Sequence, residues 1–153
     1  MGRYVIVGAF GNDDAGSNSG SAYIFYRNEG GMNNWGEVTK IVASDAAMGD
    51  LFGVPVSIWE DYAIVGATGE DSFGSRSGAA YIFYRNEGGE DNWGQFKKIV
   101  AIDGKSLDRF GFGASIWGNY AVVGAPALNT AGSAYIIEPK ETFINSILDI
   151  QKI

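Results

Sequence analysis

The chain has 153 residues, 46% of them hydrophobic, which suffices for the core of one domain. It contains no His and no Cys, which excludes a Ser-His-Asp triad, a disulfide bond and a metal site built on thiolate or imidazole ligands. The formal net charge of −7 argues against nucleic acid as a partner, because such binding needs Lys and Arg to neutralise phosphates. No apolar run approaches the roughly 20 residues of a membrane-spanning helix, so we expect no membrane insertion.

One sequence pattern recurs along the chain at a spacing of 58 residues. The run YVIVGA begins at Tyr4, YAIVGA at Tyr62 and YAVVGA at Tyr120. The nine letters YIFYRNEGG stand at 23–31 and again at 81–89. The third copy loses four residues after its YAVVGA run, so later equivalents lie 54 residues apart. This regularity predicts a repeat architecture, and an accidental resemblance within a β-sandwich does not account for it.

Each unit contains four runs that are typical of β-strands. In the second unit these are FGVPVSIW at 52–59, YAIVGA at 62–67, AAYIFYR at 79–85 and GQFKKIVA at 94–101. Only Glu60 and Asp61 separate the first two runs, which indicates a tight hairpin. Four antiparallel strands repeated in this way favour the blades of a β-propeller over a solenoid.

We therefore predict an all-β fold with about three four-stranded β-propeller blades in a single segment, 1–153. The blades are expected at 1–50, 51–108 and 109–153. The first blade lacks its innermost strand, because residues 1–3 stand where the Trp59 hairpin stands one repeat later. The final run, DIQKI, aligns with QFKKI of the second unit and is expected to be a strand despite the helix-like sequence before it.

Small and aromatic residues recur where neighbouring blades should meet. Gly8, Gly66 and Gly124 close the YxxVGA runs, and we expect them where blade backbones approach closely. Phe52 and Phe110 begin the innermost strands and are expected to fill the gap between adjacent blades. These roles are structural.

The runs RFGFGASI at 109–116 and YAVVGAP at 120–126 resemble the FG-GAP repeat of the integrin α-chain propeller and of many bacterial surface proteins. The resemblance covers almost the whole chain. It implies a propeller at the cell surface or outside the cell that binds or adheres, and it implies no enzyme activity. Many members carry a calcium loop of the form D-x-D-x-D-G between the first two strands of a blade. Here that connection has only two residues, so this calcium role does not carry over.

The loops at 10–20 and 68–78 combine acidic residues with Gly and Ser. Carboxylate oxygens there could serve as calcium ligands, although their spacing matches no known calcium loop. The four candidate metal ligands are Asp13, Asp14, Glu70 and Asp71. Asp and Ser in turns commonly hydrogen-bond to their own backbone, which is the simpler interpretation. We expect no cofactor, with calcium as the open alternative.

Acidic residues also recur in the links that precede the innermost strands. They are Asp45, Asp50, Asp103 and Asp108. An Asp just before a Phe-Gly run is expected to accept hydrogen bonds from backbone N–H groups at the blade junction.

Two tryptophans are candidates for ligand binding. Trp35 and Trp93 each stand in the sequence NWG, near Asn and acidic residues, and an exposed indole there could stack against a sugar ring. A Trp at the start of a strand more often packs inward. The ligand expected here is a protein or a glycan.

Three blades do not close a propeller, so the arc should expose two apolar blade faces. Such surface favours association, and two chains would supply six blades, which is a common propeller size. We predict a homo-oligomer, with a head-to-tail dimer favoured. The alternatives are a carbohydrate-binding propeller and a structural piece of a larger cell-surface propeller protein.

Overall fold

The computed structural model describes residues 3–127, 131–139 and 148–153, and every regular element in these ranges is a β-strand. The strands are β1 Tyr4–Ala9, β2 Ser21–Tyr26, β3 Gly36–Ile41, β4 Phe52–Trp59, β5 Tyr62–Ala67, β6 Ala79–Tyr84, β7 Gly94–Ile99, β8 Gly113–Trp117, β9 Tyr120–Ala125, β10 Ser133–Pro139 and β11 Leu148–Lys152. The all-β prediction is confirmed, and the final run of the sequence is a strand as expected. The helix-like stretch at 140–147 lies outside the described residues.

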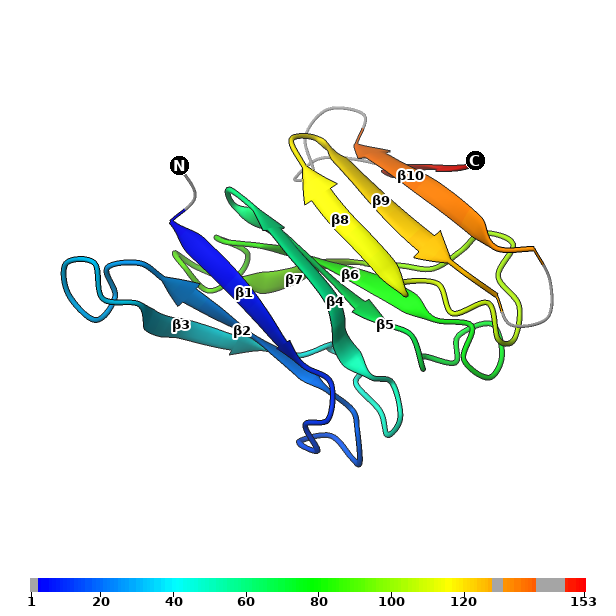
Figure 1. Ribbon diagram of the computed structural model, residues 1–153, viewed down its shortest axis with the longest axis horizontal. Coiled ribbons are helices and arrows are strands. Elements are labelled where there is room, and N and C mark those ends of the chain that lie inside the picture. Colours follow the sequence, from blue (N-terminus) through cyan, green and yellow to red (C-terminus); the bar gives the residue numbers. More distant parts are fainter. Residues whose placement is uncertain (1–2, 128–130, 140–147) are drawn as a thin grey trace.

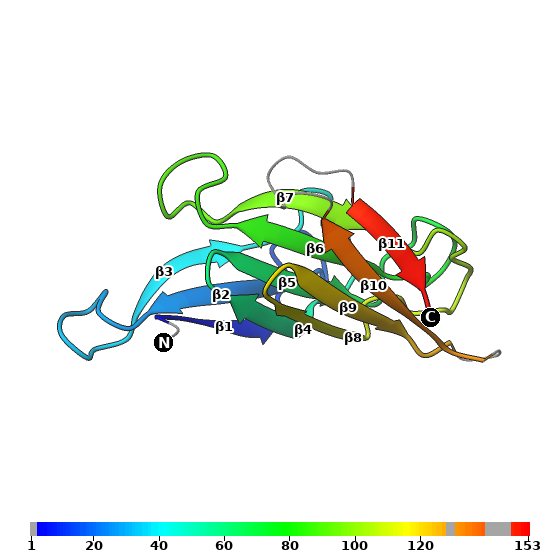
Figure 2. The same cartoon turned by 90° about the horizontal axis from the view of Figure 1, so that it is seen from above.

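The strands form three antiparallel sheets in chain order. The first sheet is β1-β2-β3, the second is β4-β5-β6-β7 and the third is β8-β9-β10-β11. Figure 1 shows β1, β4 and β8 lying side by side, and Figure 2 shows β3, β7 and β11 along the opposite side of the arc. This is the predicted set of propeller-like blades, and among the described residues no strand of the first sheet corresponds to β4 and β8.

Local sequence explains how each sheet forms. Trp59 pairs with Tyr62 across the two-residue turn between β4 and β5, so the predicted tight hairpin is present. In β6, Tyr81 and Phe83 share one face of the sheet while Ile82 lies on the other, as the period of two requires. Both faces of β6 are buried because a neighbouring sheet packs against each.

Two hydrophobic clusters hold the three sheets together. The cluster between the first and second sheets contains Phe52, which is fully buried and packs edge-on against Tyr81 and Phe83 at centroid distances of 5.6 and 5.8 Å. The cluster between the second and third sheets contains Phe110, whose ring lies 5.2 Å from that of Tyr135. Both phenylalanines fill the gaps that the sequence predicted for them.

Glycine permits the close approach of adjacent sheets at two equivalent places. A Cβ on Gly8 would lie 1.8 Å from the carbonyl oxygen of Gly53, and one on Gly66 would lie 2.1 Å from that of Gly111. At Gly124, the third equivalent, the atom nearest to such a Cβ is the backbone nitrogen of Gly113, 3.8 Å away, which is an ordinary contact. Gly8 and Gly66 each meet the sheet that follows their own, and Gly124 lies on the third of the three described sheets.

Backbone hydrogen bonds repeat across the two junctions. The N–H of Phe52 donates to the carbonyl of Ser19 at 3.1 Å, and the N–H of Phe110 donates to the carbonyl of Ser77 at 2.8 Å. Each bond ties the start of an innermost strand to the loop of the preceding sheet. In the described part of the chain there is no helix that could span a bilayer.

Candidate functional site

The acidic loops use their carboxylates to stabilise their own turns. The Oδ1 atom of Asp13 accepts a hydrogen bond from the N–H of Asn18 at 2.7 Å, and Asp71 accepts one from Arg76 at 2.6 Å. The Oε2 atom of Glu70 accepts from the N–H of Ser72. These are the bonds that acidic side chains commonly make in tight turns.

Two of the four candidate metal ligands also form ion pairs. Asp14 pairs with Lys40, and Glu70 pairs with Lys98 at 2.8 Å. Among the side chains that the structure describes, His, Cys, Asp and Glu nowhere gather in a group of three or more that could hold a metal ion. Calcium binding at these loops stays a prediction without a formed cage to support it.

Two links connect the sheets, residues 42–51 between β3 and β4 and residues 100–112 between β7 and β8. A cluster of Tyr, Asp and Lys forms where each link meets the sheet that follows it. The hydroxyl of Tyr81 donates to Asp45 at 2.9 Å, and the ammonium of Lys98 donates to the other oxygen of Asp45 at 2.6 Å. The same ammonium lies 5.6 Å from the centroid of the Tyr81 ring. We call this arrangement the Tyr–Asp–Lys cluster of the second sheet.

The third sheet repeats the cluster with Tyr135, Asp103 and Lys152. Tyr135 donates to Asp103 at 2.7 Å, and Lys152 donates to the same carboxylate at 2.5 Å. The backbone N–H partners expected from the sequence were those of an Asp just before a Phe-Gly run, whereas Asp45 and Asp103, seven residues before their Phe, accept hydrogen bonds from Tyr and Lys side chains. Each carboxylate thus joins its link to two strands of the sheet that follows, β6 and β7 for Asp45 and β10 and β11 for Asp103.

Asp50 and Asp108 do bond to backbone, but within their own link. Asp50 accepts from the N–H of Ala47, and Asp108 accepts from the N–H of Lys105, each at 2.8 Å. They therefore shape the turn that leads into the innermost strand and do not bridge two sheets.

Charge and burial set the protonation of the cluster in the second sheet. Burial acts to raise the pKa of the Asp45 carboxyl, but hydrogen bonds from Lys98 and Tyr81 outweigh it and hold that pKa below its ordinary value. Burial, and then the neighbouring Asp45 carboxylate, raise the pKa of the Tyr81 hydroxyl. The hydroxyl therefore stays a donor and the carboxylate an acceptor at neutral pH.

The first sheet has two members of this cluster and lacks the third. Tyr23 and Lys40 occupy the places of Tyr81 and Lys98, and the Lys40 ammonium lies 5.7 Å from the centroid of the Tyr23 ring. No described carboxylate bonds to Tyr23, and Lys40 pairs instead with Asp14 from a loop of the same sheet. The open position is the one that Asp45 fills one repeat later.

The structure separates the two tryptophans that the sequence treated alike. Trp93 is 1% exposed and packs edge-on against Tyr4 of the first sheet, with centroids 5.2 Å apart. Trp35, its equivalent, is 47% exposed. A buried ring offers no face to a sugar, so of the two only Trp35 presents a platform.

A groove that the sequence did not predict lies between the start of β1 and the β4–β5 turn. It has a volume of about 420 Å3, and its lining includes Tyr4, Trp59, Asp61 and Arg85. Arg85 pairs with Asp61 at 3.1 Å, and its guanidinium carbon lies 5.9 Å from the Tyr4 ring centroid. Trp59 forms one wall, and its ring packs against that of Trp117 at 5.3 Å. One repeat later, Tyr62 pairs with Trp59, whereas no described residue pairs with Tyr4 on that side of β1.

Comparison with known proteins identifies the repeat. No curated protein matches the chain. The FG-GAP repeat family matches residues 1–25, 35–83 and 93–137, which together cover most of the sequence and include strands of all three sheets, while β11 lies beyond the match. The geometry and this match agree, and the chain belongs to the FG-GAP repeat family.

Proposed function

We propose that the chain is a non-enzymatic binding or adhesion module, located outside the cell or at its surface, and that two copies join head to tail into a six-blade ring. FG-GAP repeats occur in extracellular proteins and form propeller-like modules. The acidic side chains of the described loops and links are engaged in turns and ion pairs, which argues against a dedicated catalytic pair.

The observation that carries the association is a pair of exposed aromatic residues at the two ends of the arc. Trp93 and Tyr4 make the aromatic contact between the first and second sheets. Trp35 is the equivalent of Trp93, Tyr120 is the equivalent of Tyr4, and these two side chains are 47% and 50% exposed. Placing Tyr120 of one copy beside Trp35 of another would repeat the contact already made within the chain.

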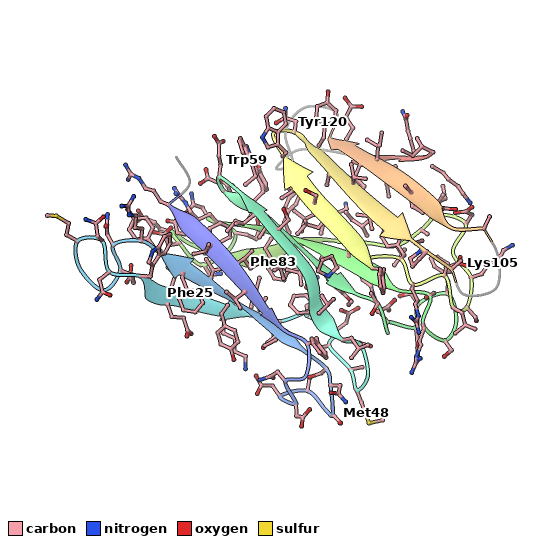
Figure 3. All side chains as sticks on the ribbon, in the orientation of Figure 1. Phe25, Met48, Trp59, Phe83, Lys105 and Tyr120 are labelled. Atoms are coloured by element: carbon pink, nitrogen blue, oxygen red, sulfur yellow. The ribbon has the colours of Figure 1, made fainter. Side chains whose placement is uncertain are left out.

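The open faces of the first and third sheets also carry exposed apolar side chains whose equivalents are buried in the second sheet. Val7 on the first sheet is 53% exposed, whereas its equivalent Val65 is fully buried against a neighbouring sheet. Val122 on the third sheet is exposed, whereas its equivalent Ile64 is fully buried. Figure 3 shows Phe25 on the first sheet and Tyr120 at the start of β9 on the third, with Phe83 of the second sheet between them. Two different faces that match each other favour a head-to-tail contact, and such a contact closes into a ring when the rotation suits.

Sedimentation velocity at micromolar concentration tests this proposal. We expect a particle of twice the 16.3 kDa chain mass, and we expect Trp35→Ala and Tyr120→Ala each to weaken the dimer by about tenfold. Phe73→Ala is the matched control, because Phe73 is an exposed aromatic on a loop of the second sheet, away from both open faces. A folded wild-type chain that sediments at 16.3 kDa would contradict the proposal.

Carbohydrate binding at Trp35 is the second candidate function. The exposed indole follows Asn33 and Asn34, and amide side chains beside an aromatic platform suit sugar hydroxyls. A glycan array probed with the wild-type chain and with Trp35→Ala separates this function from adhesion to protein. Glycan signals that disappear with Trp35→Ala while the particle mass is unchanged would favour the lectin alternative.

A further inference from the structure

A small polar pocket lies on the third sheet, beside the cluster of Tyr135, Asp103 and Lys152. It has a volume of about 140 Å3 and lies among the link before β8, the end of β9 and the strands β10 and β11. Its polar lining consists of Asp103, Lys105, Asp108, Ser133, Tyr135 and Lys152, and alanines complete it. None of these residues belongs to the first sheet, so the pocket is separate from the groove beside Tyr4.

The second sheet shows what stands at the equivalent place. In the loop after β5, the N–H of Gly69 donates to the carbonyl of Asp50 at 3.0 Å. The next residue is Glu70, whose carboxylate pairs with the Lys98 ammonium at 2.8 Å and accepts a hydrogen bond from the Ser72 hydroxyl at 2.6 Å. Because Glu70 is only 8% exposed, the second sheet encloses this carboxylate beside the Lys of its cluster.

The third sheet follows the same backbone path up to this point and then departs from it in sequence. The N–H of Ala127 donates to the carbonyl of Asp108 at 3.1 Å, which is the equivalent of the bond just described. The next residue in the sequence is Leu128, which lies outside the described residues. The whole run 126–132, PALNTAG, contains no acidic residue. This loop therefore supplies no counterpart of the Glu70 carboxylate.

The balance of charge favours an added carboxylate more in the third sheet than in the second. In the second sheet, one ammonium serves three carboxylates. They are Asp45, Asp50 and Glu70 around Lys98. The pocket of the third sheet has two carboxylates and two ammonium groups, because Lys105 stands where the second sheet has Ala47. Lys105 is exposed, and within the described chain its ammonium forms no ion pair. With one carboxylate added, the pocket would still be less negative than the site that encloses Glu70.

We propose that this pocket binds a glutamate side chain of another polypeptide. The bound carboxylate accepts a hydrogen bond from the Lys152 ammonium, as Glu70 does from Lys98, and the exposed Lys105 (labelled in Figure 3) supplies a second cation. Glutamate is the residue that the chain itself uses at the equivalent place, and a pocket of about 140 Å3 lined by alanines suits its two methylene groups better than a wider sugar ring. The proposal names a partner chemistry for the binding module proposed above and rests on that function, but it does not require two copies to associate.

NMR titration of the isotopically labelled chain with a blocked glutamate, N-acetylglutamic acid α-amide, tests the proposal at constant ionic strength. We expect saturable shifts of the backbone amides of Ser133 and Tyr135, which line the pocket. The blocked glutamine is neutral and nearly the same size, so it should bind about tenfold more weakly. Glucuronate is the third probe, and tighter binding of glucuronate than of the blocked glutamate would overturn the assignment to a polypeptide.

Variants of the protein then locate the site. Lys105→Met should weaken binding of the blocked glutamate by about fivefold, whereas Lys97→Met removes the same charge from β7 and should leave binding unchanged. Both lysines are exposed, so neither change should disturb folding. Equal effects of the two variants would overturn the proposal, because the attraction would then not be local. Absence of saturable shifts, or equal affinities for the glutamate and glutamine probes, would also overturn it.

Sedimentation separates this inference from the proposed ring. A chain that sediments as a monomer but binds the blocked glutamate at the pocket contradicts the ring alone. A dimer whose Ser133 and Tyr135 amides ignore the probe contradicts the glutamate site alone.

Discussion

The junction between the first two sheets and the open face of the first sheet are built from nearly the same sequence in different surroundings. Trp93 and Trp35 stand in the same NWG triplet, yet one is 1% exposed and the other 47%. Phe83 and Phe25 stand in the same YIFYRNEGG run, yet only Phe83 is fully enclosed. The difference teaches that a repeat specifies its own strands, whereas the neighbouring repeat decides which of its side chains are buried.

The largest expected effect comes from removing an aromatic ring at the filled junction. Phe83→Ala should lower the free energy of unfolding by about 3–5 kcal/mol, because the ring is buried against Phe52 and leaves a cavity. Phe25→Ala is the matched control and should have a clearly smaller effect. Urea unfolding at a protein concentration low enough to exclude association measures both. Equal losses of stability for the two variants would show that Phe25 and Phe83 are equally enclosed, which would contradict the difference in burial described here.

Adding a single methyl group at equivalent glycines compares the filled junction with the open face of the third sheet. Gly66→Ala should destabilise the chain by about 2–3 kcal/mol, because its Cβ would meet the backbone oxygen of Gly111 at 2.1 Å. Gly124→Ala should be neutral within error, since the nearest atom to its Cβ is 3.8 Å away. Thermal melting of the two variants gives the ranking. A reversed ranking would mean that the third sheet meets a neighbour that this chain does not provide.

Removing one hydroxyl probes the Tyr–Asp–Lys cluster. Tyr81→Phe should lower the free energy of unfolding by about 1 kcal/mol, because Asp45 loses a hydrogen bond in a half-enclosed site. Tyr23→Phe, in the sheet without the Asp, should change stability by less than this. Chemical unfolding of both variants measures the two losses of stability. A larger loss for Tyr23→Phe would contradict the role given to the Tyr81–Asp45 hydrogen bond.

The smallest expected effect is on acid stability. The pKa of Asp45 is lower in the folded chain than its ordinary value, so its carboxylate stabilises the fold above about pH 3.9. That contribution is lost as the pH falls below this value and through the lowered pKa of the folded state. Because the carboxylate is 46% exposed, the contribution should stay under about 1 kcal/mol. Asp45→Asn should flatten the dependence of unfolding free energy on pH below about pH 4, and an unchanged slope would exclude this role.

The sequence predicted the strands and their grouping because these depend on local period and on the repeat interval. The burial of Phe52 and Phe110 also followed, since both recur at the start of an innermost strand. The Tyr–Asp–Lys clusters did not follow, because each joins three segments that are far apart in the chain, such as Asp45 and Lys98. Local sequence likewise cannot separate Trp35 from Trp93, since the difference lies in whether a preceding sheet covers the ring.

The groove beside β1 was missed for a related reason. It exists because Tyr4 has no Trp opposite it, and a missing partner leaves no residue to find in the sequence. Aligning the repeats shows the missing strand, but only the structure shows that Trp59 and Arg85 enclose the resulting space.

Residue-resolved hydrogen exchange of β1 and β5 tests most directly whether neighbours decide the state of each repeat. The two strands have the sequences YVIVGA and YAIVGA, but β1 pairs on one edge and β5 on both. We predict that alternate amides of β1 exchange about 100-fold faster than their equivalents in β5, while the amides that face β2 are protected. Equal protection along both strands would contradict the account, because the free edge of β1 would then not exist in solution.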